Sequence, residues 1–297
     1  MMQNDSTSSN STNGIFKLRF KNLDAIIKNL PIFKNEYKII SPIKINDNRG
    51  IYKVINITTQ QKYVLKFVLA SDIDENKMNI FEFYKNNVHK NFCRLYDAKK
   101  YDMFYLLVLE YIDGDNLGTF FSENINDRCT IKNIIFDIMS AIKYIHSNNI
   151  MHCDIKPDNI IIRYDPFENT YYPVIIDFDT SKYACCGMEY YTKYSFGTKK
   201  YIAPEIFNHI YKQESDIWSL GVTLYYTLSN LNILYNNNSF DITDGLKSIE
   251  HTFGSNIANV IKNMLVYNVK YRIGIDTLIQ QLTLDDNVLQ QVQQSQN

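Results

Sequence analysis

The chain has 297 residues, of which 45% are hydrophobic and 21% are charged, and its formal net charge is -1. These proportions are typical of a globular protein, and the balanced charge excludes a broad electrostatic attraction to nucleic acid or anionic lipid. No run of about 18 apolar residues occurs in it, so no membrane-spanning helix is expected.

The cysteines and the N-terminal residues indicate the compartment. The chain has an odd number of cysteines and no Cys-x-x-Cys pair, so neither a disulfide framework nor a zinc site is expected. Residues 1–14 are polar and lack the apolar core of a signal peptide. We therefore expect an intracellular, cytoplasmic protein with reduced thiols, and a monomer. The cysteines are Cys93, Cys129, Cys153, Cys185 and Cys186.

The first half of the chain predicts a small β-rich lobe. Residues 1–14 are expected to form a flexible tail, and residues 15–36 an N-terminal extension. From residue 37 to residue 110, turn-forming clusters separate short β-rich apolar runs, and one helix is expected over residues 74–88. The expected strands lie within residues 37–40, 51–57, 63–69 and 104–109.

The remainder predicts a larger, mainly helical lobe over residues 111–283, followed by a C-terminal tail over residues 284–297. Apolar residues spaced three and four apart predict a helix over Ile131 to His146. The stretch Ile217 to Leu228 is apolar nearly all round, which is typical of a buried helix. The sequence therefore predicts an α+β fold of two lobes, with a ligand cleft between them.

The candidate chemistry lies in His152-Cys153-Asp154-Ile155-Lys156-Pro157-Asp158-Asn159 and in the later Asp177-Phe178-Asp179. Phosphoryl transfer requires a carboxylate facing the acceptor hydroxyl, a cation near the moving phosphate and oxygen ligands for Mg²⁺. Asp154, Lys156, Asn159 and Asp177 supply this set of groups.

These residues resemble the catalytic loop of the eukaryotic protein kinases, which reads His-Arg-Asp with a Lys two residues on and an Asn five residues on. The resemblance implies that Asp154 accepts the proton of the substrate hydroxyl and that Lys156 steadies the γ-phosphate. It also implies ATP as cofactor. Asn159 and Asp177 would then hold Mg²⁺, with Mn²⁺ as an alternative metal.

Further motifs follow in the order expected for this family. Gly197-Thr198 to Ala203-Pro204-Glu205 resembles the end of a kinase activation segment, which in the family forms a platform for a peptide substrate. Asp216 resembles the family's aspartate that braces the catalytic loop. Arg272 falls where the family has an arginine paired with the glutamate at the position of Glu205. The resemblance covers residues 37 to 282.

In the first lobe, Tyr63-Val64-Leu65-Lys66 resembles the family's Val-Ala-Ile-Lys strand, so Lys66 is the expected phosphate anchor. Its expected helix partner is Glu82, with Glu75 as the alternative. By the same resemblance the backbone of Glu110 and Ile112 binds the adenine edge, and Asp115 or Asn116 could reach the ribose. The expected nucleotide contacts are Ile45, Gly50, Tyr52, Val64, Lys66, Leu109, Glu110, Ile112, Asn159, Ile161 and Asp177.

The chain departs from the family pattern at three places. Of the three glycines expected over the phosphates only Gly50 remains, and Asp47 adds a negative charge there. Asp179 replaces the glycine of Asp-Phe-Gly, which predicts altered switching. Cys153 replaces an arginine, so activation through a phosphate on Thr192 or Ser195 is not expected, and Cys153 is expected to be a buried structural thiol.

Three functions are compatible with these features. The retained Lys66, Asp154, Asn159 and Asp177 favour an active serine/threonine protein kinase that phosphorylates Ser or Thr of other proteins. The eroded glycine loop favours a pseudokinase that binds nucleotide or acts as a scaffold. A small-molecule phosphotransferase is disfavoured, because the segment from Gly197 to Glu205 resembles a peptide platform.

Overall fold

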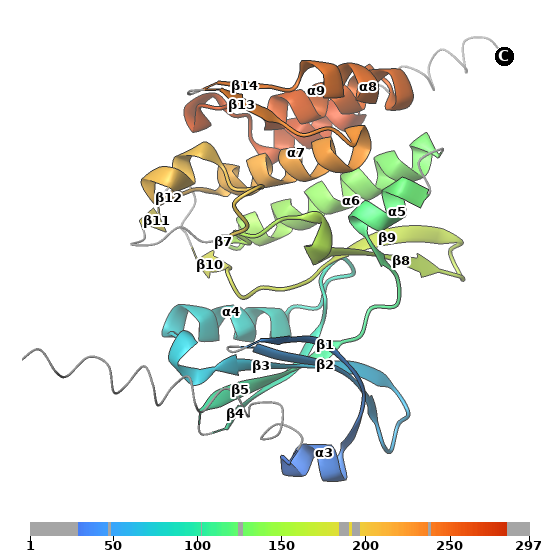
Figure 1. Ribbon diagram of the computed structural model, residues 1–297, viewed down its shortest axis with the longest axis vertical. Helices are drawn as coiled ribbons and strands as arrows, with labels where there is room; N and C mark the ends of the chain where they lie inside the picture. The colour runs from blue at the N-terminus through green and yellow to red at the C-terminus, as the bar shows by residue number, and fades with distance from the viewer. Residues whose placement is uncertain are drawn as a thin grey trace, which may run out of the picture. The chain divides into compact units, whose positions relative to one another are not determined.

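The structure of the protein is a computed structural model, which describes residues 29–46, 49–101, 103–123, 127–183, 190–191, 197–236 and 239–283 (Figure 1). The chain divides into two units. Unit 1 comprises Met1–Val88 and Arg94–Tyr111, and unit 2 comprises His89–Cys93 and Ile112–Asn297. Unit 1 is rich in strands and unit 2 is mainly helical, so the predicted α+β class is confirmed.

Unit 1 is built on one antiparallel sheet in the order β1-β2-β3-β5-β4. The helix α4 packs against β4, and Asp74 caps it by accepting a hydrogen bond from the backbone of Lys77 at 2.8 Å. The elements are α3 (Pro31–Asn35), β1 (Tyr37–Asn46), β2 (Arg49–Asn56), β3 (Lys62–Leu69), a 3-10 turn (Ala70–Asp72), α4 (Glu75–Asn86), β4 (Leu95–Tyr101) and β5 (Phe104–Glu110).

The hydrophobic core of unit 1 lies on one face of this sheet. Side chains of a β-strand alternate between the two faces, so Tyr52, Leu65 and Phe67 share the core face with residues of β5. Ile32 of α3 joins this core, so the end of the predicted N-terminal extension packs with the sheet. The strand β4 was not predicted, because its sequence lacks a regular apolar alternation.

Unit 2 is organised around two long helices, both confirmed as predicted. Asp127 caps α6 by accepting hydrogen bonds from two backbone N–H groups, and α7 is buried along nearly its whole length. The helices are α5 (Leu117–Glu123), α6 (Arg128–Ser147), α7 (Gln213–Ser229), α8 (Thr243–Phe253) and α9 (Ser255–Met264). Residues 275–283 are also helical.

Short strands connect these helices. The hairpin formed by β8 and β9 carries β6 on its edge. The segment His89–Cys93 belongs with this hairpin, because the backbone N–H of Cys93 donates to the carbonyl of Ile175 at 2.9 Å. The strands are β6 (Asp115–Asn116), β7 (Ile150–Met151), β8 (Ile160–Asp165), β9 (Thr170–Ile175), β10 (Lys182–Tyr183), β11 (Tyr190–Tyr191), β12 (Ile210–Tyr211), β13 (Leu234–Asn236) and β14 (Ser239–Asp241). The 3-10 turns are Pro157–Asn159, Pro204–Asn208 and Val269–Tyr271.

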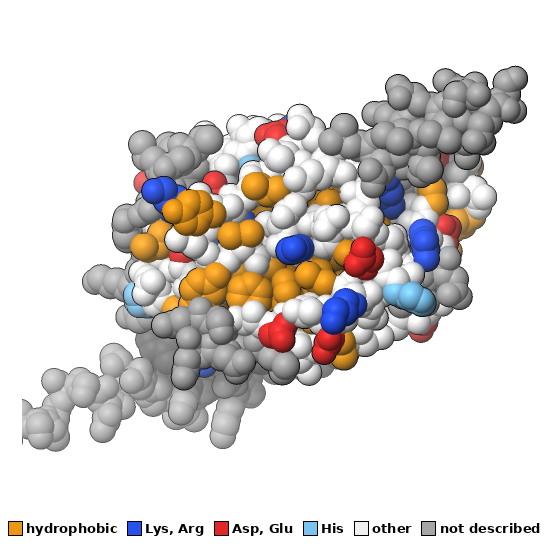
Figure 2. Space-filling view, turned by 90° about the horizontal axis from the view of Figure 1, so that it is seen from above, with side chains coloured by type: hydrophobic (Ala, Val, Ile, Leu, Met, Phe, Trp, Pro, Cys, Tyr) orange, Lys and Arg blue, Asp and Glu red, His pale blue; other side chains and the backbone are white. Residues whose placement is uncertain are grey.

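At the end of unit 2 that carries α8 and α9, Figure 2 shows a band of hydrophobic side chains with Lys, Arg, Asp and Glu side chains beside it. Within the described residues, no helix combines the length and the apolar character needed to cross a bilayer. The predicted terminal tails, Asp47, Thr192, Ser195 and the cysteine pair 185–186 lie outside the described residues.

Candidate active site

A buried aspartate of α7 holds the catalytic loop in place. The carboxylate of Asp216 accepts the backbone N–H groups of His152 and Cys153, both at 2.8 Å, and lies 2.9 Å from the ring Nε2 of His146. Burial alone would raise the pKa of Asp216, but the hydrogen bond to His146 and the neighbouring histidines lower it. The bracing role that the resemblance implied for Asp216 is therefore present.

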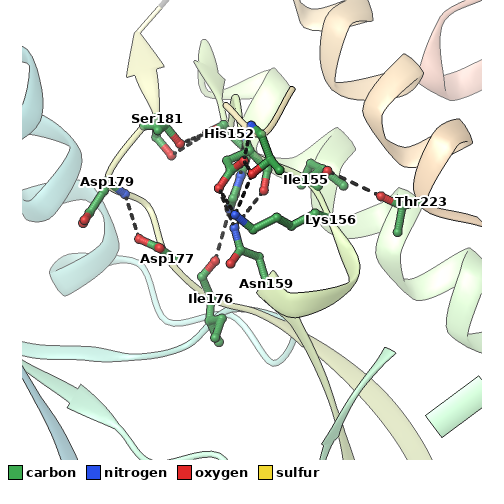
Figure 3. A network of polar contacts seen from close by, with 12 residues as sticks. His152, Ile155, Lys156, Asn159, Ile176, Asp177, Asp179, Ser181 and Thr223 are labelled. Atoms are coloured by element: carbon green, nitrogen blue, oxygen red, sulfur yellow. Dashed lines mark hydrogen bonds and ion pairs between the residues drawn. The ribbon is translucent and has the colours of Figure 1, made fainter. Parts of the chain in front are cut away.

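The loop presents the carboxylate of Asp154 with its orientation set on both oxygens. Its Oδ2 accepts hydrogen bonds from Lys156 Nζ at 2.7 Å and Asn159 Nδ2 at 3.0 Å. Its Oδ1 accepts hydrogen bonds from the backbone N–H and the hydroxyl of Thr198, at 3.0 and 2.8 Å. Figure 3 shows the side-chain ends of Lys156 and Asn159 lying close together. The structure thus brings Asp154, Lys156 and Asn159 together, as predicted.

Thr198 is a member of this network whose direct contact with the carboxylate the sequence did not reveal. Lys156 Nζ also donates to its hydroxyl, at 2.8 Å. Gly197 makes this approach possible, because it has φ +97° and a Cβ there would lie 2.8 Å from the carbonyl oxygen of Cys153. The end of the activation segment is thereby attached to Asp154.

Asn159 and Asp177 reach the same region through the pairing of β8 with β9. The carbonyl of Asn159 accepts the backbone N–H of Ile176 at 2.9 Å, and Asp177 is the next residue. The amide nitrogen of Asn159 donates to the carbonyl of Asp154 at 2.8 Å. Of its two side-chain polar atoms, its oxygen is therefore the one suited to a metal ion.

These two residues fit Mg²⁺. The ion prefers oxygen ligands, and it is commonly held by one or two protein side chains together with water and substrate phosphates. The described residues contain no group of three or more His, Cys, Asp or Glu side chains that could hold a metal ion. Asn159 and Asp177 therefore suit a metal that a bound nucleotide would help to ligate.

The Asp177-Phe178-Asp179 motif has a left-handed backbone at its first residue. The left-handed residue is Asp177 itself, with φ 67°, whereas Asp179 is not among the positive-φ residues. The backbone N–H of Asp179 lies 3.4 Å from Asp177 Oδ1 (Figure 3). Asp at the third position of this motif therefore requires no left-handed backbone here.

In unit 1, strand register decides which side chains share a face with Lys66. Its cross-strand partners are Ile51 on β2 and Leu107 on β5. Val64, two residues before Lys66 on β3, pairs with Lys53 of β2 and with Leu109 of β5. Val64 and Leu109 therefore lie on the same face of the sheet as Lys66, as the predicted nucleotide site requires.

Tyr52 is one exception among the predicted contacts on this sheet. It is fully buried in the core on the opposite face, and Ile51 takes the position that the sequence analysis assigned to Tyr52. The reason is that a displacement of one residue along a strand moves a side chain to the other face. Ile51 therefore lies on the face of Lys66. Ile45 pairs with Gly50, whose partner on β3 is Phe67 of the core, so the register places the side chain of Ile45 on the opposite face, against the prediction.

The structure does not favour the predicted pairing of Lys66 with Glu82. Lys66 is buried, whereas Glu82 is exposed. The buried face of α4 consists of Ile80, Phe81 and Tyr84. At about 100° per residue Glu82 points away from that face. The alternative, Glu75, is exposed as well.

Lys53 is held at the end of β5 by a tyrosine that the sequence analysis did not single out. Its Nζ donates to the hydroxyl of Tyr111 at 2.7 Å and lies 3.9 Å from the centre of that ring. The backbone N–H of Glu110 is taken by the carbonyl of Arg94 at 2.9 Å, so that N–H is not available to adenine. Lys53 therefore adds a second cation to the face of Lys66.

In unit 2, the residues that follow the connector mainly serve local structure. Ile112 is buried, and Ile161 pairs with Asn116 across β8 and β6. The side chain of Asn116 accepts the backbone N–H of Thr119 at 3.1 Å, which satisfies one of the free N–H groups at the start of α5. This bond uses the side-chain oxygen of Asn116, so a contact with a ribose would come from its side-chain NH2 group.

The pairing of Arg272 with Glu205 that the motifs implied is present in unit 2. Arg272 forms a bidentate ion pair with Glu205, at 2.7 and 3.0 Å, and its side chain is fully buried. Ser215 donates to the same carboxylate at 2.7 Å. Cys153 is buried, as predicted, and this burial raises the pKa of its thiol well above the usual value, which disfavours a thiolate nucleophile.

Comparisons with known proteins agree with this geometry. The family model described as protein kinase domain matches residues 49–283. The chain is 30% identical over 284 residues to calcium-dependent protein kinase 4 of Plasmodium falciparum (isolate 3D7), covering 86% of this chain and 52% of that protein. It is 31% identical over 253 residues to calcium-dependent protein kinase 5 of Plasmodium berghei (strain Anka), covering 77% and 42%.

The chain thus spans about half the length of the relatives that it matches. The family model covers the catalytic loop, the residues that orient Asp154 and the Glu205–Arg272 pair. The chain belongs to the eukaryotic-type protein kinase family.

Proposed function

We propose that this protein is an ATP-dependent serine/threonine protein kinase. One observation carries the proposal: Lys156, Asn159 and Thr198 together orient both oxygens of the Asp154 carboxylate. Such a fixed carboxylate is suited to receive the proton of an incoming hydroxyl. The match to the kinase family and the names of the relatives support the same activity.

The side chains of the site would divide the work as follows. Asp154 orients the acceptor hydroxyl and takes its proton, while Lys156 places positive charge beside that carboxylate. ATP supplies the γ-phosphoryl group, and Mg²⁺ or Mn²⁺ neutralises the charge that develops on it. Asn159 and Asp177 would hold the metal. Lys66 would bind phosphate oxygens from unit 1.

We further propose that the other predicted nucleotide contacts hold with three changes: Ile51 replaces Tyr52, Ile45 is removed, and Glu82 has no role at the site. The contact between Thr198 and Lys156 supports the serine/threonine branch. The proposed partners are protein substrates, and the proposed state is an intracellular monomer. The proposed contacts are Gly50, Ile51, Val64, Lys66, Leu109, Glu110, Ile112, Asn159, Ile161 and Asp177.

A pseudokinase is the second candidate, and one observation in unit 1 favours it. Glu82, the expected partner of Lys66 on α4, is exposed and lies off the buried face of that helix. A lysine that is not positioned by this glutamate would bind the phosphates more weakly, while the catalytic loop would be unaffected. A scaffold that binds nucleotide weakly would have these properties.

Phosphate transfer from γ-labelled ATP to myelin basic protein and casein tests the proposal, with Mg²⁺ and then Mn²⁺. Asp154→Asn should abolish labelling of Ser and Thr. The matched control is Asp276→Asn, the same change at an exposed residue that pairs with Lys143. Nucleotide binding without labelling by the wild type would establish the pseudokinase instead. Equal labelling by the wild type and Asp154→Asn would refute the role of Asp154.

A further inference from the structure

The residues that follow Thr198 are held close to the proposed acceptor site. Thr198 contacts Asp154 through its backbone N–H and its hydroxyl, and Asp154 would bind the hydroxyl that becomes phosphorylated. Consecutive Cα atoms are about 3.8 Å apart. Lys199 and Lys200 are therefore among the residues nearest to any peptide that presents its Ser or Thr to Asp154.

Both lysines offer positive charge to solvent. Lys199 is exposed, and in the described part of the chain no carboxylate pairs with it. Lys200 is also exposed, and its Nζ lies 3.5 Å from the ring centre of Tyr226. A contact between a cation and an aromatic ring fixes the position of the ammonium group but leaves its charge in place.

The carboxylates of this region offset little of that charge. Arg272 neutralises Glu205, and Lys156 lies 2.7 Å from Asp154. Asp158 is exposed and lies close enough to Tyr201 to help raise the pKa of that phenol, although burial contributes more. Among these described residues, one exposed acid thus stands against two exposed lysines, so their net charge is positive.

We propose that Lys199 and Lys200 make this protein select substrates with acidic side chains beside the phosphorylated Ser or Thr. The inference rests on the proposed kinase activity and adds to it a chemical class of substrate. A solvent-exposed ion pair changes a binding constant by about 1.5- to 5-fold. Two lysines should therefore favour an acidic peptide over its neutral counterpart by roughly five- to tenfold at low salt.

The test uses three peptides that differ only beside a single Ser, where they carry Asp, Asn or Lys. The specificity constant kcat/KM for each is measured with the wild type, Lys199→Gln, Lys200→Gln and the double variant. Lys199→Arg keeps the charge and should keep the preference. The matched control is Lys247→Gln, an exposed lysine on α8 whose contact with Asp244 is long, at 3.8 Å. Peptide binding without nucleotide is followed in parallel by fluorescence anisotropy.

The expected result is a five- to tenfold preference for the Asp peptide that falls below twofold in the double variant and in high salt. The preference should lie mainly in KM, and Lys247→Gln should retain it. Phosphorylation without a preference for the Asp peptide, or with a preference that persists in the double variant, would overturn this inference. The proposed kinase activity would still stand. Selective binding of the Asp peptide without turnover would support this inference but not the proposed kinase activity. The absence of both binding and turnover would refute both proposals.

Discussion

Lys66 of β3 and Ile51 of β2 are direct cross-strand partners on one face of the sheet in unit 1. Residues in such a pair have Cβ atoms about 5 Å apart, so the aliphatic branches of Ile51 stand beside the stem of the lysine. The proposed function assigns Lys66 to the phosphates of ATP. The size of residue 51 therefore becomes a determinant of nucleotide affinity.

We expect Ile51→Gly to weaken ATP binding, because it removes the apolar contact that the proposed nucleotide site assigns to residue 51. The dissociation constant of Mg–ATP, measured by titration calorimetry, should rise about fivefold, which corresponds to about 1 kcal/mol. Ile55→Gly is the control, since Ile55 lies on the same strand but opposite Lys62. Equal effects of the two changes would contradict the role of Ile51.

We expect Gly197→Ala to impair phosphate transfer more than stability alone explains. The alanine Cβ would lie 2.8 Å from the carbonyl oxygen of Cys153 and would move Thr198 away from Asp154. Gly254→Ala is a close control, because Gly254 has a similar φ of +96° and no atom within 4 Å of the added Cβ. Both changes should cost about 1–3 kcal/mol of backbone strain. Only Gly197→Ala should also lower kcat, by at least about tenfold.

We expect Arg272→Met to destabilise unit 2 strongly, because it leaves the buried carboxylate of Glu205 without its cation. The loss should be about 3–5 kcal/mol. Urea unfolding followed by fluorescence would measure it, since Trp218 is the single tryptophan and lies on α7 of unit 2.

Two further variants control this measurement. Lys143→Met removes an exposed pair with Asp276 and should cost less than about 1 kcal/mol. Glu205→Gln combined with Arg272→Met removes the unpaired charge and should recover part of the stability. A loss of similar size in Lys143→Met and Arg272→Met would show that burial of the Glu205–Arg272 pair is unimportant.

The pH dependence of stability should reveal Asp216. Its pKa in the folded protein is lowered from the ordinary 3.8, so its carboxylate stabilises the fold above that value, and the contribution is lost as the pH falls through the lower folded pKa. Asp216→Asn should therefore lose stability at pH 7, and its difference from the wild type should shrink below pH 3.8. Urea unfolding at pH 7, 5 and 3 would measure this difference.

Asp244→Asn serves as the control, because the side chain of Asp244 is 89% exposed. Its stability should follow that of the wild type at every pH. A gap between the wild type and Asp216→Asn that stayed constant from pH 7 to pH 3 would contradict the lowered pKa of Asp216.

Much of unit 2 could be predicted because its signals are contained in short continuous segments. The spacing of apolar residues predicted α6 and α7, and the catalytic-loop residues come together through bonds between near neighbours in the chain. The long-range pairs Asp216–His152 and Glu205–Arg272 were implied by the order of motifs, and the structure confirms them.

Unit 1 was predicted less well, because the positions of its side chains depend on the register of strand pairing and on the rotational position of each residue around a helix. The assignment of Tyr52 missed by one residue, and one residue is enough to change the face of a strand. Glu82 was chosen for its charge and position, whereas the phase of α4 points it to solvent. The strand β4 has exposed lysines and lacks the alternation that identifies a strand.

The sequence by itself determined the family and the two kinds of unit, and it predicted the site residues Asp154, Lys156, Asn159 and Asp177, because closely spaced residues in the catalytic loop and its neighbouring motif carry these signals. Only the tertiary structure decided that Thr198 contacts Asp154, that Ile51 lies opposite Lys66 and that Lys53 reaches Tyr111. These contacts join residues far apart in the chain. Their geometry follows from strand register and from a left-handed glycine, neither of which residue type or spacing specifies.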